Sequence, residues 1–164
     1  MKALVGVVLL VVVLVSGGTA LAQEPIRIGL LVPLTGGLAE FGIAAKPAVE
    51  FRLEEAGWKV AGRPIKLIVA DSAAQPAMAL DQGKKLVEHD KVHVVIGPFV
   101  SGPRLAVEPY FAQNRIPSLT LTNHTPAAKK FGWTIFLRGT FFQVPYPLGL
   151  YASEQLGLKS ATTL

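Results

Sequence analysis

Short apolar runs alternate along this chain with longer stretches in which apolar residues recur every three or four positions. The short runs span residues 26–32, 65–70, 92–96, 116–121 and 134–137. Most of them end at Gly, Pro or Asp, which interrupt regular structure. Continuous apolar runs of this length are typical of strands buried on both faces of a parallel sheet.

The stretches between these runs have the period of amphipathic helices. They cover residues 41–56 and 76–89, a third segment that ends at residue 113, and residues 145–156. Pro47 removes a helix hydrogen bond, so the regular part of the first helix is expected to begin near it. The side chains expected to face the core are Ala45, Ala48, Val49, Leu53 and Ala56 in the first helix, Ala79, Leu80, Gly83, Leu86 and Val87 in the second, and Leu105, Ala106 and Ala112 in the third.

This alternation of strand and helix predicts the α/β class, with a doubly wound parallel sheet that is incomplete at its C-terminal end. Each crossover is expected to be right-handed. Ligands of such sheets bind outside the carboxyl ends of the strands. Those ends are the loops at residues 33–41, 71–75, 97–102 and 122–124.

The first 22 residues have the pattern of an export signal. Lys2 precedes an apolar run over residues 3–15, and Ala20 and Ala22 form a small-x-small cleavage site. A membrane-spanning helix needs about 20 apolar residues, so a retained anchor is the weaker interpretation. Cleavage would leave 142 of the 164 residues, a length that suits one domain.

Composition narrows the possible chemistry. The formal charge is +5 and falls to +4 without Lys2, and its basic residues are scattered, so nucleic acid is not an expected partner. The absence of cysteine excludes disulfides, thiolate metal sites and cysteine nucleophiles. His89, His93 and His124 are too dispersed for a recognisable metal site. The loop at 97–102 lacks the Lys-Ser/Thr of a phosphate loop, so no enzyme, cofactor or metal is expected.

Four stretches together carry a resemblance to a known family. They are IRIGLLVPLTGGLAEFG (26–42), IKLIVADSAAQPAMALDQGKKLVEHDKVHVVIGPFVSG (65–102), IPSLTLTN (116–123) and FLRGTFFQVPYPLGLYASEQLG (136–157). Their order and spacing resemble the Leu/Ile/Val-binding proteins, the periplasmic solute-binding components of ABC transporters. The resemblance implies an N-terminal fragment of a protein of that kind.

The resemblance also implies a domain organisation and a mechanism. Residues 1–22 are then a signal peptide, 23–138 a first solute-binding lobe, and 139–164 the crossing into a truncated second lobe. Such a protein holds an amino acid or related small solute between two lobes, in the periplasm, and delivers it to a membrane permease. Because the closing lobe is missing, little or no binding of leucine, isoleucine or valine is expected. A ligand-sensing receptor or regulatory domain of the same fold, and a non-functional fragment, remain alternatives.

Candidate ligand-binding residues lie in the loops at the strand ends. The resemblance implies that Ser101 receives a solute carboxylate, helped by amides at the start of a helix; without it, Ser101 is an ordinary N-cap. It also places Thr122 at a solute contact, and His124 where relatives carry threonine, as a contact or a solvated loop residue. Phe41 either packs over the solute or anchors a helix start. The neighbours Val100 and Asn123 complete the candidate set. For Asp71 a structural role is expected, accepting amide hydrogen bonds that orient a loop.

Overall fold

A computed structural model describes residues 23–122, 132–137 and 145–160. The expected signal sequence lies outside these residues. The strands of the described residues are β1 (Ile26–Val32), β2 (Lys59–Val60), β3 (Arg63–Asp71), β4 (Val94–Ile96), β5 (Ser118–Thr120) and β6 (Thr134–Phe136). The helices of the described residues are α2 (Ala39–Glu55), α3 (Pro76–Glu88), α4 (Ser101–Gln113) and α5 (Pro145–Leu150). A π-helical turn, η3 (Tyr151–Gln155), follows α5.

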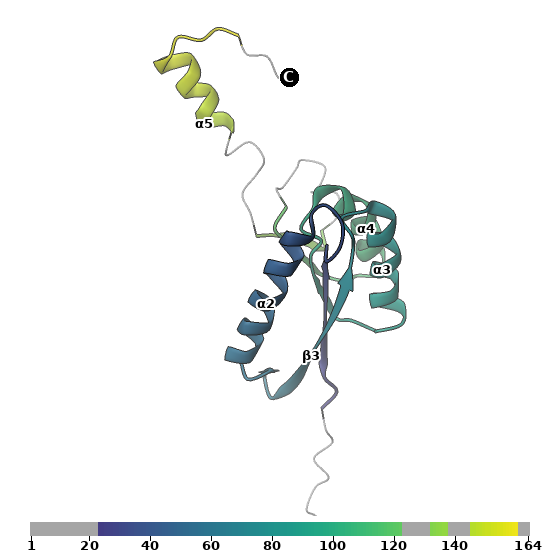
Figure 1. The fold of residues 1–164 in the computed structure, drawn as a ribbon. Coiled ribbons are helices and arrows are strands. Elements are labelled where there is room, and N and C mark those ends of the chain that lie inside the picture. Colours follow the sequence, from purple (N-terminus) through teal and green to yellow (C-terminus); the bar gives the residue numbers. More distant parts are fainter. Residues whose placement is uncertain (1–22, 123–131, 138–144, 161–164) are drawn as a thin grey trace, which may run out of the picture.

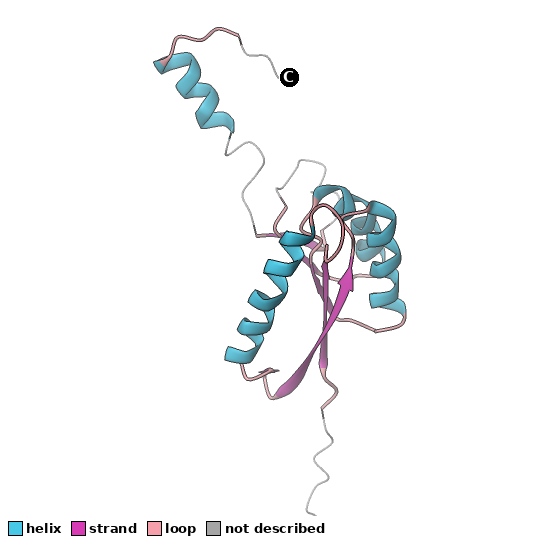
Figure 2. Cartoon of the chain, in the orientation of Figure 1, coloured by secondary structure: helices cyan, strands magenta, loops and turns pink. Residues whose placement is uncertain are grey.

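The six strands form one sheet in the order β2-β3-β1-β4-β5-β6. All neighbours are parallel except β2 and β3, which form a hairpin. Helix α2 lies on one face of the sheet, and α3 and α4 lie on the other (Figure 1). The same view coloured by secondary structure shows α5 apart from this body (Figure 2). The predicted α/β class and parallel winding are therefore confirmed.

The core lies between the sheet and the α3–α4 layer. A single cluster joins side chains of the strands to side chains of both helices, and its buried members are Leu31, Ala70, Leu86, Val92, Val95, Val107 and Phe111. Parallel strands need apolar residues on both faces, because helices cover both. β1 accordingly places Leu30, Leu31 and Val32 in succession at 0 % exposure.

The hairpin strand β2 was missed by the sequence analysis. Ala61 and Gly62 connect it to β3, and both have positive φ, of 48° and 79°. Two successive positive φ values are characteristic of the tight turns that join antiparallel strands. The usual sequence signal of such a turn is Asn-Gly or Asp-Gly. The Ala-Gly found here is not such a signal, so the turn was not predicted.

Two predictions about α2 were wrong. The helix runs without interruption through Pro47, because that residue lies on an exposed turn where water can bind the carbonyl left without a partner. Leu53 is the one expected core residue of α2 that is buried, while Ala48 and Ala56 are exposed. Among the helices of the described residues, α2 is the one on its face of the sheet, so few of its side chains are covered.

The prediction of which face of α4 lies toward the core was also wrong. Leu105 is 52 % exposed, whereas the side chains buried beneath the helix are Arg104, Val107, Glu108 and Phe111. These four positions have the i, i+3, i+4, i+7 spacing of one helix face. Two of them are charged, so an analysis that places charges outside assigns the wrong face.

Helices α3 and α4 approach closely at Gly83. A Cβ at this residue would lie 2.4 Å from Val107 Cγ2 and 3.3 Å from the Phe111 ring. We expect Gly83→Ala to lower the free energy of unfolding by about 1 to 2 kcal/mol, because overpacking outweighs the gain in helix propensity. Urea denaturation measures the change. Gly149→Ala, in α5, is the control, because a Cβ there meets nothing within 4 Å; equal stability of the two variants would contradict the packing argument.

Candidate functional site

Three loops at the carboxyl ends of the strands meet around an apolar hollow. The hollow has a volume of about 330 Å³ and is lined by Phe41, Ala44, Ala45, Phe99 and Leu121. These residues come from the start of α2, the loop after β4 and the end of β5. Ligands of open α/β sheets bind at this edge. Phe41 is 53 % exposed and Leu121 is 43 % exposed, so the side chains that line the hollow are accessible to a solute.

Ser101 begins α4 two residues after Phe99. Val100, rather than Ser101, occupies the N-cap position, in an extended conformation and without a side-chain cap. The N-cap interpretation of Ser101 is therefore wrong. Its side chain is exposed, and its hydroxyl makes no hydrogen bond to the other described residues. The first amides of a helix have no intrahelical partner, so this hydroxyl and the amides of Ser101 and Gly102 can receive an anion.

Thr122 lies close to the same loop, but its side chain points inward. It is 5 % exposed, and its hydroxyl lies 3.1 Å from that of Thr120. The Thr120 hydroxyl donates in turn to the Pro98 carbonyl at 2.6 Å. The threonine pair thus holds the end of β5 against the loop before Ser101. Asn123 and His124 lie outside the described residues.

Gly97 lets β4 turn into this loop. Its φ of +103° is in a region that favours glycine, and its amide donates to Leu119 at 2.7 Å. A Cβ at residue 97 would lie 2.1 Å from the Leu31 carbonyl oxygen. The direction of the chain toward Phe99 and Ser101 therefore depends on the missing side chain.

Asp71, at the end of β3, holds the loop after β1. Its Oδ1 accepts from the amides of Leu34 and Ala73, each at 2.7 Å, and its Oδ2 accepts from the Thr35 hydroxyl at 2.6 Å. The expected structural role of Asp71 is thereby confirmed. Burial raises the pKa of this carboxyl, but the hydrogen bonds from Thr35, Leu34 and Ala73 together outweigh it, so the pKa is lowered overall.

This lowered pKa predicts a pH dependence of stability. A carboxyl with a lower pKa in the folded state stabilises the fold fully above its unfolded pKa, about 4, and the contribution is lost as the pH falls through the folded value. We expect Asp71→Asn to destabilise the chain at pH 7 by about 1 to 2 kcal/mol and to flatten the loss of stability below pH 4. Urea denaturation across pH 2.5–7 measures both. Asp81→Asn, on α3, is the control, and an unchanged acid limb in Asp71→Asn would contradict the assignment.

A buried ion pair lies one turn below the start of α4, and the sequence analysis missed it. The guanidinium of Arg104 is paired with the carboxylate of Glu108, and their side chains are 3 % and 2 % exposed. The guanidinium carbon also lies 5.2 Å from the centre of the Phe136 ring on β6. The only signal in the sequence is the i, i+4 spacing of opposite charges, which usually marks an exposed helix face.

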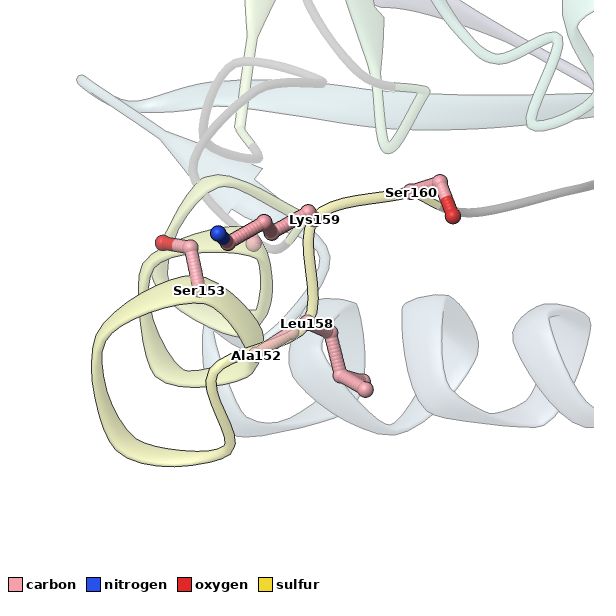
Figure 3. Close-up of a pocket in the computed structure, with 6 residues that line it drawn as sticks. Ala152, Ser153, Leu158, Lys159 and Ser160 are labelled. Carbon is pink, nitrogen blue, oxygen red and sulfur yellow. The ribbon is translucent and has the colours of Figure 1, made fainter.

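A second hollow, of about 250 Å³, lies between η3 and the residues that follow it. Figure 3 shows Leu158 pointing away from Ser153 and Lys159 there. None of the candidate residues lines it. In the described part of the chain, no three His, Asp or Glu side chains are grouped to hold a metal, and no helix is long and apolar enough to cross a membrane.

An open parallel sheet with an accessible apolar hollow beside a helix N-terminus is the architecture of an α/β solute-binding domain. The sequence profile of the family described as "Periplasmic binding protein" matches residues 25–164. The chain belongs to this family, whose members bind solutes for ABC transporters and are not enzymes.

Individual relatives agree with this assignment. The Leu/Ile/Val-binding protein BraC3 of Rhizobium johnstonii is 33 % identical over 120 residues, which are 72 % of this chain and 32 % of that protein. The Leu/Ile/Val-binding protein homolog 2 of Brucella abortus is 37 % identical over 102 residues, which are 61 % of this chain and 27 % of that protein.

A solved structure shares the fold. It is the ABC-transporter solute-binding protein of Rhodopseudomonas palustris BisB5, in complex with 3,4-dihydroxybenzoic acid. The two superpose with a TM-score of 0.74 at 26 % identity, over 80 % of this chain and 36 % of that one. The chain therefore spans about a third of the length of the proteins that it matches.

Proposed function

We propose that this chain carries the first-lobe half of a site for a small carboxylic acid, in an exported solute-binding component of an ABC-type amino-acid uptake system. The observation that carries the proposal is the apolar hollow at Phe41, Phe99 and Leu121, close to the first amides of α4 and to the exposed Ser101 hydroxyl, which has no hydrogen-bond partner among the described residues. A zwitterionic amino acid with an apolar side chain needs both features, donors for its carboxylate and an apolar wall for its side chain.

Each candidate residue has a definite task in this proposal. The Ser101 hydroxyl and the amides of Ser101 and Gly102 donate to the solute carboxylate, whose charge is favoured by the helix N-terminus. The Phe41 ring covers the apolar part of the solute. The Thr122 hydroxyl is engaged by Thr120, so Thr122 acts by holding the loop. Val100 supplies the turn into α4.

The two kinds of solute found in relatives make different demands. Relatives are named for leucine, isoleucine and valine, and one was solved with a dihydroxybenzoic acid. A branched-chain amino acid requires acceptors for its ammonium group, whereas an aromatic acid requires only ring contacts and carboxylate donors. The pair of phenyl rings at Phe41 and Phe99 favours an aromatic acid as the second candidate, because rings stack on rings.

The remainder of the mechanism follows from the family. Residues 1–22 direct the chain to the periplasm, residues 23–138 form the first lobe, and residues 139–164 lead toward a second lobe. Closure of two lobes over the solute stabilises the state that a membrane permease recognises. Residues 23–138 by themselves would bind without the closing contacts of a second lobe, so their affinity for leucine, isoleucine or valine is expected to be weak. A sensing role would use the same site but deliver the closed state to a signalling partner.

Nuclear magnetic resonance titration tests the site directly. We expect leucine or benzoate, at millimolar concentration, to shift the amide signals of Phe41, Phe99, Ser101, Gly102 and Leu121. Leucine acting alone favours the amino-acid assignment, and benzoate acting alone favours the aromatic acid. Glucose, which has no carboxylate, is expected to shift none of them.

Matched serine variants separate binding from folding. Ser101→Ala is expected to weaken the binding about tenfold, the loss of one hydrogen bond to a charged group. Ser153→Ala, whose hydroxyl donates to Leu150 at the surface, is expected to leave binding unchanged. Shifts centred away from the hollow, or none with either acid, would overturn the proposed function.

A further inference from the structure

The residues of the buried ion pair follow Ser101 along α4, with the basic one first. Arg104 follows Ser101 by three residues, and Glu108 follows Arg104 by four, so all three lie on one face of the helix. Along the axis, Arg104 is about 4.5 Å from Ser101 and Glu108 is about 10.5 Å from it. Arg104, which carries the cation, is therefore attached to the helix nearer to Ser101 than Glu108 is.

Helix stability does not account for this order of charges. A helix favours acidic groups near its N-terminus and basic groups near its C-terminus, and an acidic residue four positions before a basic one is the more favourable arrangement. The order Arg104 then Glu108 is the opposite. Replacing a buried ion pair by apolar residues of similar size is often neutral or stabilising. The pair and its direction therefore need another explanation.

The pair adds to the field of the helix at its N-terminus. The helix dipole already places partial positive charge there, and the cation of the pair is carried by the residue nearer to that end. Both side chains are almost fully buried, so water and salt screen the pair weakly. Its position is held by the Phe136 ring, which lies 5.2 Å from the guanidinium.

Two buried atoms of the pair also lack partners. Within the described residues, Arg104 Nε and Glu108 Oε1 make no hydrogen bond. Leaving such atoms unsatisfied is costly, so a pair kept for stability alone is expected to be better satisfied.

We propose that the Arg104–Glu108 pair is an electrostatic specificity element, which makes the N-terminus of α4 select an anionic group over a neutral one of the same shape. Arg104 is a positioning residue in this scheme, because it acts through the field at Ser101 and not by touching the solute. The inference rests on the proposed function for its biological meaning. The field itself is measurable without any solute.

A thiol placed at residue 101 reports that field. The chain contains no cysteine, so Ser101→Cys introduces a single thiol, and its pKa follows from the rate of alkylation as a function of pH. The comparison background is Arg104→Glu with Glu108→Arg, which keeps a pair but reverses its direction. We expect the thiol pKa to be about one unit higher in the reversed background, a tenfold change in thiolate fraction.

A neutral background guards against a variant that fails to fold. Arg104→Met with Glu108→Leu removes both charges, and the thiol pKa is expected to lie between the other two. Circular dichroism identifies the variants that fold. If the variant with the reversed pair does not fold, the comparison is made between the native and neutral backgrounds, and equal thiol pKa values in these two would overturn the proposal. If all three backgrounds fold, equal thiol pKa values in all of them would overturn it.

Solute selectivity provides a second test of the proposal. In the native chain, benzoate is expected to bind about tenfold more tightly than the neutral benzamide, and the reversed pair is expected to remove most of that ratio. A purely structural role would change both affinities together and leave their ratio intact. If neither benzoate nor benzamide binds but the thiol pKa differs between the backgrounds, the field is present and the proposed function fails. If the thiol pKa and the preference for benzoate over benzamide are both the same in the native and reversed backgrounds, the inference alone is refuted.

Discussion

Gly97→Ala is expected to lower the free energy of unfolding by about 3 kcal/mol or more. A positive φ costs a residue with a Cβ about 1 to 2 kcal/mol, and overpacking adds about 1 to 3 kcal/mol. Both penalties apply here, because φ is +103° and the added Cβ would lie 2.1 Å from the Leu31 carbonyl oxygen. That oxygen belongs to the central strand of the sheet and cannot move aside as a flexible side chain can.

Urea denaturation followed by circular dichroism measures the loss. Gly37→Ala is the matched control, since residue 37 also lies in a loop at the strand ends but a Cβ there meets nothing within 4 Å. The control is expected to stay within about 0.5 kcal/mol of the native chain. Native-like stability of Gly97→Ala would show that the loop before Ser101 has another conformation than the one described.

Glu108→Leu is expected to destabilise the chain by about 3 to 5 kcal/mol. Its physical reason is that Arg104, 2 % exposed, would remain in the core without its anionic partner. The second substitution Arg104→Met removes that uncompensated charge. The double variant is therefore expected to recover most of the lost stability, although it carries more changes than the single variant.

A double-mutant cycle in urea provides the measurement. The interaction energy between the two positions is expected to be large and of the sign that favours the pair. Leu105→Met, on the exposed face of the same helix, is the control and is expected to leave stability nearly unchanged. Additive effects of the two single substitutions would contradict the burial of the pair.

Strand β1 and helix α3 were predicted well because their signals are local. β1 was expected at residues 26–32 and occupies Ile26–Val32, and the helix expected at 76–89 is α3, Pro76–Glu88. A parallel strand buried on both faces must be apolar at successive positions, and a Pro at the first helical turn marks a helix start. Neither property depends on residues far away in the chain.

The buried face of α3 was predicted correctly, but those of α2 and α4 were not, because burial depends on what lies opposite. Leu105 is an apolar residue in α4 and was assigned to the core, yet Arg104 is the residue that lies beneath the helix. Charged side chains are rarely buried unless they are paired, so sequence analysis places them outside. Here the partner, Glu108, lies one turn away, and the covering ring, Phe136, lies on β6.

Some residues of the candidate site were likewise predicted from the sequence, and others were not. Ser101 and Phe41 became candidates through the family resemblance, and the structure brings them and Val100 to one edge of the sheet. Sequence alone left the direction of Thr122 open, and the structure shows it engaged with Thr120 beneath the loop. Phe99, Ala44 and Leu121 line the hollow but were not among the candidates. No short motif marks apolar residues that become neighbours only when three strands align.

The order of apolar runs and breakers in this sequence by itself determined the α/β class, the parallel strands and the edge where a solute can bind, because each follows from hydrogen bonding and apolar spacing within a few residues. Tertiary structure alone decided which side chains meet at that edge and which charges lie beneath it. Those choices depend on contacts such as that of Arg104 on α4 with Phe136 on β6, where residues more than thirty positions apart share one environment.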